Sequence, residues 1–115
     1  MLPIRFRTTP NKCAVIEVEE PYSLFAGFLN GEGKPGRADR LLELIDDSLS
    51  NTKATTQVNQ DYAVLTLNGN RQAAQLKAEN LPEETIEECE MPLELLRQIT
   101  SEWLNYLKAV EEEAQ

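Results

Sequence analysis

The sequence contains no histidine, the side chain most often used as a general base or metal ligand at neutral pH. Hydrolysis by a serine or cysteine that a histidine activates is therefore excluded. The two cysteines, Cys13 and Cys89, lie far apart and lack the spacing of a metal motif. Cys89 stands among glutamates, which raise the pKa of a thiol and lower its reactivity. We therefore predict a protein that is not an enzyme, uses no cofactor and keeps both cysteines reduced.

Three glycines precede a predicted helix in the order G-x-G-x-x-G: Gly31, Gly33 and Gly36. In a dinucleotide-binding domain, such glycines let a pyrophosphate approach a helix N-terminus. The acidic residue expected about 20 residues later is missing, because position 56 is a threonine. We therefore interpret residues 30–37 as a surface loop, with weak anion binding by Lys34 and Arg37 as an alternative.

Acidic side chains are concentrated near the end of the chain. Residues 79–115 contain eleven acidic and two basic side chains, so they carry the whole net charge of −9. Such a surface repels nucleic acids and anionic membranes, and it attracts basic proteins or cations. The simpler interpretation is that these side chains are solvated and keep the protein soluble.

A calcium site would need about six to eight converging oxygen atoms, and the EF-hand spacing with its central glycine is absent. Cation binding by residues 79–91 therefore remains a minor alternative, and a basic protein is the predicted partner. The predicted partner-binding residues are glutamates of this segment and one aromatic residue: Glu83, Glu84, Glu87, Glu88, Glu90 and Tyr106.

Apolar periodicity predicts the elements that would carry these residues. Residues 4–7 and 13–18 predict two antiparallel strands, and residues 22–29 predict a third. A helix that ends near residue 50 is predicted by an apolar stripe at helical spacing: Ala38, Leu41, Leu42, Ile45 and Leu49.

The second half of the chain predicts a hairpin, an irregular acidic segment and a helix. The hairpin turns at Asn68-Gly69, and a three-residue loop that would place Val64 opposite Ala74 is favoured. Residues 79–91 are expected to be irregular, with Leu81 and Ile86 as apolar anchors. The helix begins near Met91-Pro92, with Trp103 in its buried stripe and Tyr106 at the edge of that stripe.

This order of elements predicts the α+β class, with an antiparallel sheet of about five strands and both helices on one face. A length of 115 residues suits one domain, 1–115. No apolar run approaches the roughly 18 residues that cross a bilayer, and the first seven residues are too charged for a signal peptide. We therefore expect a cytoplasmic protein. A homo-oligomer is compatible with the sequence but is not predicted by it.

The hairpin at 61–77, the acidic segment after it and the closing helix resemble small bacterial proteins of two kinds. The helix carries this likeness in Met91-Pro92-Leu93-Glu94-Leu95-Leu96 and Trp103-Leu104-Asn105-Tyr106-Leu107. One kind is the uncharacterised YacL-type family, and the other is the immunity-like proteins that neutralise polymorphic toxins. The resemblance implies a non-enzymatic protein-binding module, whose acidic third would suit a basic toxin through electrostatic steering. The alternative is a small-ligand or cation-binding domain that uses residues 30–37 or 79–91.

Overall fold

The structure is a computed structural model that describes residues 1–80 and 83–113. A two-stranded antiparallel sheet comes first, formed by β1 (Ile4–Thr8) and β2 (Ala14–Val18), and the helices α1 (Leu24–Gly31) and α2 (Pro35–Ser50) follow it. A four-stranded antiparallel sheet in the order β3-β4-β5-β6 comes next, built from β3 (Thr55–Gln60), β4 (Ala63–Asn68), β5 (Ala73–Asn80) and β6 (Thr85–Pro92). The last element is the long helix α3 (Leu93–Glu113). The predicted α+β class with antiparallel strands is confirmed.

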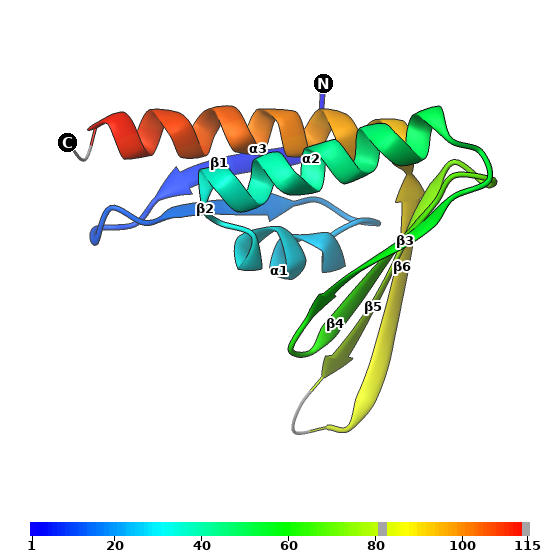
Figure 1. The fold of residues 1–115 in the computed structure, drawn as a ribbon. Helices are drawn as coiled ribbons and strands as arrows, with labels where there is room; N and C mark the ends of the chain where they lie inside the picture. The colour runs from blue at the N-terminus through cyan, green and yellow to red at the C-terminus, as the bar shows by residue number, and fades with distance from the viewer. Residues whose placement is uncertain (81–82, 114–115) are drawn as a thin grey trace.

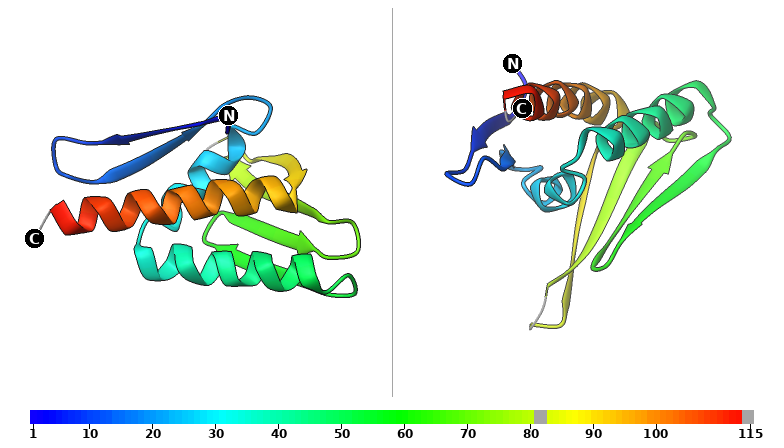
Figure 2. Two further views of the ribbon diagram at one scale, coloured as in Figure 1. Left: turned by 90° about the horizontal axis from the view of Figure 1, so that it is seen from above. Right: turned by 60° about the vertical axis from the view of Figure 1, so that its left-hand side comes forward.

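The three helices lie on one face of the four-stranded sheet, and its other face carries no helix (Figures 1 and 2). Helices α2 and α3 run side by side, and Arg97 of α3 pairs with Asp46 of α2 at 2.6 Å. Alternation along the strands matches this arrangement, because each strand presents successive side chains to opposite faces. On β4, for example, Leu65 and Leu67 are fully buried beneath the helices.

The hydrophobic core lies between the sheet and the helices. It is formed by buried apolar side chains of all three helices and of the strands that they cover. Trp103 of α3, Phe25 of α1 and Ile45 of α2 are each fully buried there. Burying a side chain of this size stabilises the fold by about 1.5 to 3 kcal/mol. The two helices predicted from apolar stripes are confirmed, although α3 begins two residues after Met91.

The third predicted strand, over residues 22–29, is wrong, because this segment forms α1. Phe25, Phe28 and Leu29 are buried with helical spacing. The exposed positions of α1 include Gly27 and Gly31, which carry no charge, so the segment lacks the polar face that identifies an amphipathic helix. Strands β3 and β6 were not predicted either. The expected single sheet of about five strands with two helices is therefore replaced by two sheets with six strands in all and three helices among the described residues.

The described residues of the segment 79–91 are mostly not irregular, since residues 79–80 complete β5 and residues 85–91 form most of β6. Ile86 is not an anchor in the core, because its side chain is 67 % exposed. Leu81, the other predicted anchor, lies outside the described residues.

The predicted register of the β4–β5 hairpin is also wrong. Val64 pairs with Lys77 instead of Ala74, because the connection spans residues 69–72. Gln72 has a φ of 53°, the left-handed conformation that lets a chain reverse direction. The observed register places Leu65 opposite Leu76 on the buried face, so apolar pairing is kept by a longer turn.

No helix among the described residues is both long and apolar enough to span a bilayer.

Gly69 offers a test of how this turn packs. A Cβ atom at Gly69 would overlap the carbonyl oxygen of Asn51 and lie 2.9 Å from that of Ser48. We therefore expect Gly69→Ala to lower the free energy of unfolding by about 1 to 3 kcal/mol, as overpacking of a buried site does. Gly27→Ala is the matched control, because a Cβ there meets nothing within 4 Å. The control should raise stability by about 0.5 to 1 kcal/mol, as alanine does in a helix interior. Urea unfolding followed by circular dichroism measures both, and equal effects of the two variants would contradict the turn geometry.

Candidate protein-binding surface

The β5–β6 hairpin extends beyond the rest of the sheet. Strand β4 pairs with β5 only as far as Ala63 opposite Ala78. Strands β5 and β6 continue to pair through Glu79 opposite Ile86 and on to Asn80 opposite Thr85. The end of this hairpin therefore projects past the β3–β4 turn as an arm (Figure 1).

The five predicted glutamates all lie on this hairpin, but they do not form one cluster. Glu88 and Glu90 face the helix-free side of the sheet. There they pair across the sheet with Lys77 at 3.5 Å and with Arg71 at 2.9 Å. Exposed pairs of this kind contribute about 0 to 1 kcal/mol each, so they align the strands without removing the charge from solvent.

The other three predicted glutamates lie nearer the end of the arm. Glu83 and Glu84 belong to the turn, and Glu87 lies opposite Ala78 on the helix side of the sheet. With Glu79, these residues make the end of the arm strongly acidic. The described residues beyond Ala78 in this arm include no lysine or arginine.

Two large apolar side chains are exposed beside these acids. Ile86 is 67 % exposed, and Tyr62 in the β3–β4 turn is 60 % exposed. Both line a hollow of about 460 Å³ on the helix-free face, together with Val64, Lys77 and Glu79. Exposed apolar residues that gather at a hollow with a polar rim are a feature of protein-association sites, so this hollow is the candidate surface.

Tyr62 also borders a second hollow, on the opposite side of the β3–β4 turn. This hollow has a volume of about 490 Å³ and lies between α1 and the sheet, with Phe28 and Leu76 on its apolar wall. The backbone of Tyr62 is held in place, because its carbonyl oxygen accepts a hydrogen bond of 2.8 Å from the amide of Glu79. Tyr62 therefore lies at the border between the hollow on the helix-free face and the hollow beside α1.

Tyr106, the sixth predicted residue, lies elsewhere. Its ring stacks on Phe6 at a centroid distance of 4.7 Å, and its hydroxyl is 2.6 Å from the hydroxyl of Thr8. It therefore packs against the N-terminal hairpin and does not join the glutamates. Sequence analysis missed Tyr62 and Ile86 in its place, although an isoleucine within a run of glutamates was a signal for an exposed apolar residue.

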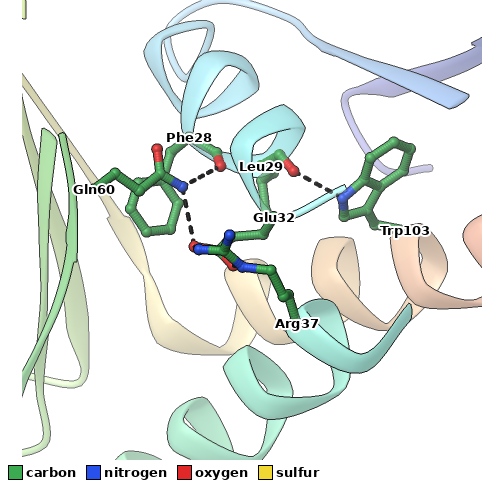
Figure 3. Close-up of polar contacts among 6 residues, drawn as sticks. All are labelled: Phe28, Leu29, Glu32, Arg37, Gln60 and Trp103. Carbon is green, nitrogen blue, oxygen red and sulfur yellow. Dashed lines mark hydrogen bonds and ion pairs between the residues drawn. The ribbon is translucent and has the colours of Figure 1, made fainter. Parts of the chain in front are cut away.

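The glycine-rich segment 30–37 is not one surface loop as predicted, because residues 30–31 end α1 and residues 35–37 begin α2. Internal contacts hold the connection between the two helices (Figure 3). The Glu32 side chain is only 6 % exposed, and its carboxylate accepts hydrogen bonds from Arg37 at 2.9 Å and from Gln60 at 3.0 Å. A bound anion would meet this carboxylate and would compete with it for Arg37. The geometry therefore does not favour an anion site at the start of α2.

Close packing explains two of the three glycines in this segment. A Cβ at Gly31 would lie 2.7 Å from the amide of Gln60, and one at Gly33 would lie 2.9 Å from the carbonyl oxygen of Asn30. Among residues 1–80 and 83–113, no three acidic or cysteine side chains are placed so that they could hold a metal ion.

Cys13 and Cys89 are free thiols in different surroundings. Burial raises the pKa of the Cys89 thiol above its usual value, and the carboxylate of Glu20 raises it further. The predicted direction is therefore confirmed, but burial is the first cause, and the carboxylate that contributes lies outside the run of glutamates. The Sγ atom of Cys89 also lies 3.3 Å from the carbonyl oxygen of Pro21, to which it donates.

This difference predicts unequal alkylation of the two cysteines. Because its pKa is raised, Cys89 stays protonated, and therefore unreactive, to a higher pH. Cys13 is exposed, so the reagent reaches it directly. Iodoacetamide at neutral pH should therefore modify Cys13 several-fold faster than Cys89, and the ratio should narrow as the pH rises. Peptide mass spectrometry over time measures both rates, and the protein in denaturant is the control in which they converge. Faster modification of Cys89 in the folded protein would contradict its described environment.

Comparison with family models, with curated proteins and with solved structures finds no match to this chain. The function proposed below therefore rests on the geometry of this surface.

Proposed function

We propose that this protein is a non-enzymatic, cytoplasmic protein-binding module that recognises a basic protein. The binding site is the acidic-arm surface, defined as Tyr62, Val64, Glu79, Glu84 and Ile86. One observation carries the proposal: Tyr62 and Ile86 line a single hollow on the helix-free face of the sheet, next to an arm rich in glutamate.

The two apolar side chains supply the affinity in this proposal. Burying an isoleucine that is left exposed contributes about 1.5 to 3 kcal/mol. Tyrosine is among the residues that most often dominate the binding energy of an interface, since it combines a large apolar area with a polar hydroxyl. Tyr62 borders two hollows, so a partner that enters either hollow can contact it.

The glutamates supply attraction at longer range and discrimination between partners. Their charges lie in solvent, where salt screens interactions beyond about 10 Å at 0.1 M. They therefore increase the rate of association with a basic partner more than they increase the final affinity. Nucleic acids and anionic membranes are negatively charged, so the glutamates repel them, and they are not partners in this proposal.

An immunity-like role, in which the protein neutralises a toxin by binding it, is the specific form of this proposal. Neutralisation requires a surface that covers the toxin and requires no catalysis. The acidic arm beside two exposed apolar side chains supports this role. It is tested by co-expression with the captured partner, which should be toxic to cells alone and harmless with this protein.

The charge of the arm predicts a binding difference between two variants of equal net charge. Immobilised protein is used to capture a partner from source cells, and the partner is then purified and titrated by calorimetry. Glu79→Gln/Glu84→Gln should weaken binding about tenfold in 0.05 M salt, and by less as the salt rises. Glu102→Gln/Glu112→Gln on α3 is the matched control, with the same net charge and wild-type affinity. Equal losses in the two variants would show that only total charge matters and would contradict the proposed site.

The apolar part of the site predicts a loss of affinity that does not depend on salt. Tyr62→Ala should weaken binding of the same partner by at least tenfold, because truncation of a central tyrosine removes more than about 1.4 kcal/mol. Tyr62→Phe is the control for folding and for the ring, and it should keep most of the affinity. A partner that binds wild type and Tyr62→Ala equally well would rule out the acidic-arm surface as its site.

A further inference from the structure

Free strand edges attract other strands, because their outward N–H and C=O groups have no partner, and proteins usually protect them with charges, proline or a covering group. Three of the free edges in this fold are protected in this way. Strand β6 carries exposed Glu87, Glu88 and Glu90 and ends at Pro92. Strand β1 carries Arg5 and Arg7, both exposed.

The free edge of β2 is covered by a side chain that takes the place of a neighbouring strand. The amide of Asn30 accepts a hydrogen bond from the backbone N–H of Ile16 and donates one to its carbonyl oxygen, both at 3.0 Å. These are the two groups that an additional strand would use at this position. An added strand would therefore have to displace Asn30.

Strand β3 has no such protection. Its sequence, Thr-Thr-Gln-Val-Asn-Gln, contains no charge and no proline. It pairs with β4 at six consecutive positions without a bulge, and it is the last strand on its side of the sheet. The edge is therefore regular and neutral over its whole length.

The hydrogen bonds of the sheet show which backbone groups of β3 point outward. The amide of Gly69 donates to the carbonyl oxygen of Ala54 at 2.9 Å, so Ala54 faces β4. Hydrogen-bonded positions alternate along an antiparallel ladder, so the backbones of Thr56, Val58 and Gln60 also face β4. The N–H and C=O groups of Thr55, Gln57 and Asn59 therefore point away from the sheet.

We propose that two copies of this chain associate through β3, in antiparallel pairing with Gln57 opposite Gln57 of the second copy. This register places Thr55 opposite Asn59 of the second copy, and the reverse, so all three outward-facing residues of each strand are hydrogen-bonded. The two four-stranded sheets then form one continuous sheet around a two-fold axis.

Charges at the two ends of β3 select this register. With Gln57 opposite itself, the turn residues that flank β3 come together across the two-fold axis, and Lys53 of each copy lies near Asp61 of the other. Both residues are exposed, and neither forms an ion pair within the described part of its own chain. Opposite charges facing each other across strands stabilise pairing, and two-fold symmetry makes this contact twice.

A groove beside the same edge also fits a second copy. It has a volume of about 260 Å³ and lies between α2 and β3. Leu41, Leu44 and Val58 form its apolar wall, and the ion-paired side chains of Arg37 and Arg40 form its rim. Val58 and Leu44 are only partly buried in the single chain. In the proposed register, Val58 lies opposite Thr56 of the second copy, so strand pairing brings further side chains over this groove.

Sedimentation equilibrium tests the association directly. Wild-type protein should show twice the mass of one 13.0 kDa chain, with dissociation on dilution. Gln57→Pro should be monomeric and folded, because the N–H that it removes points away from the sheet and proline is tolerated on an edge strand. Gln57→Thr is the matched control and should remain dimeric. Wild type that stays monomeric up to about 1 mM, or a Gln57→Pro variant that is folded and still dimeric, would overturn the proposal.

A charge exchange tests the register and does not depend on how well the proline variant folds. Asp61→Lys should raise the dimer dissociation constant about tenfold or more at low salt, because it replaces two attractive contacts with two repulsive ones. Lys53→Asp combined with Asp61→Lys should restore the wild-type constant. A double variant that associates no better than Asp61→Lys alone would overturn this register. These measurements use the protein by itself, so their outcome is independent of whether the acidic-arm surface binds a partner.

Discussion

The final carbonyl groups of any α-helix have no partner within the helix, and burying them unpaired costs about 1 to 3 kcal/mol each. At the end of α1, side chains from distant parts of the chain meet this need (Figure 3). The indole N–H of Trp103 donates to the carbonyl oxygen of Leu29 at 2.9 Å, and the amide of Gln60 donates to that of Phe28 at the same distance. Asn30, in the same turn, holds the backbone of Ile16. This one turn therefore ties together the N-terminal hairpin, the four-stranded sheet and α3.

The packing of the helices determines which surfaces of the sheet are left open. Each of the three helices contacts strands of the four-stranded sheet on the same face, and the opposite face remains uncovered (Figure 2). The β5–β6 hairpin continues past the region that α1 covers, so both of its faces are exposed at the end. The proposed binding surface follows from this one-sided packing, whereas the free edge of β3 follows from the strand order.

The parts of the fold that the sequence predicted are those with a clear period. Apolar stripes identify α2 and α3, and alternation identifies β1 and β2. In each of these elements one face is buried and the other is exposed to solvent. Helix α1 was mistaken for a strand because glycines replace the charged residues of its outer face. Strand β6 was missed because its first half is exposed on both faces. Glutamates occupy both faces there, so the sequence shows no alternation of apolar and polar residues. Strand β3 was missed because its half-buried face carries Thr56 and Gln60 beside a single valine.

The same reasons limit how much of the candidate surface could be predicted. The acidic charge was located on the correct segment, but only the strand register shows that Glu87 faces the helix side while Glu88 and Glu90 face the open side. Tyr62 was expected within the hairpin at 61–77. Its exposure depends on the tight turn between β3 and β4, which could not be inferred without β3. Tyr106 was placed correctly at the edge of the stripe of α3, yet it packs on Phe6 because the N-terminal hairpin lies over that helix.

Amide hydrogen exchange, measured on the protein alone and with the captured basic partner, tests the central claim most directly. The proposed surface predicts slower exchange with the partner in residues 61–64, 77–79 and 85–88, with little change in the exposed parts of α2 and α3. Slower exchange confined to α2 and α3, or to the N-terminal hairpin, would contradict the account.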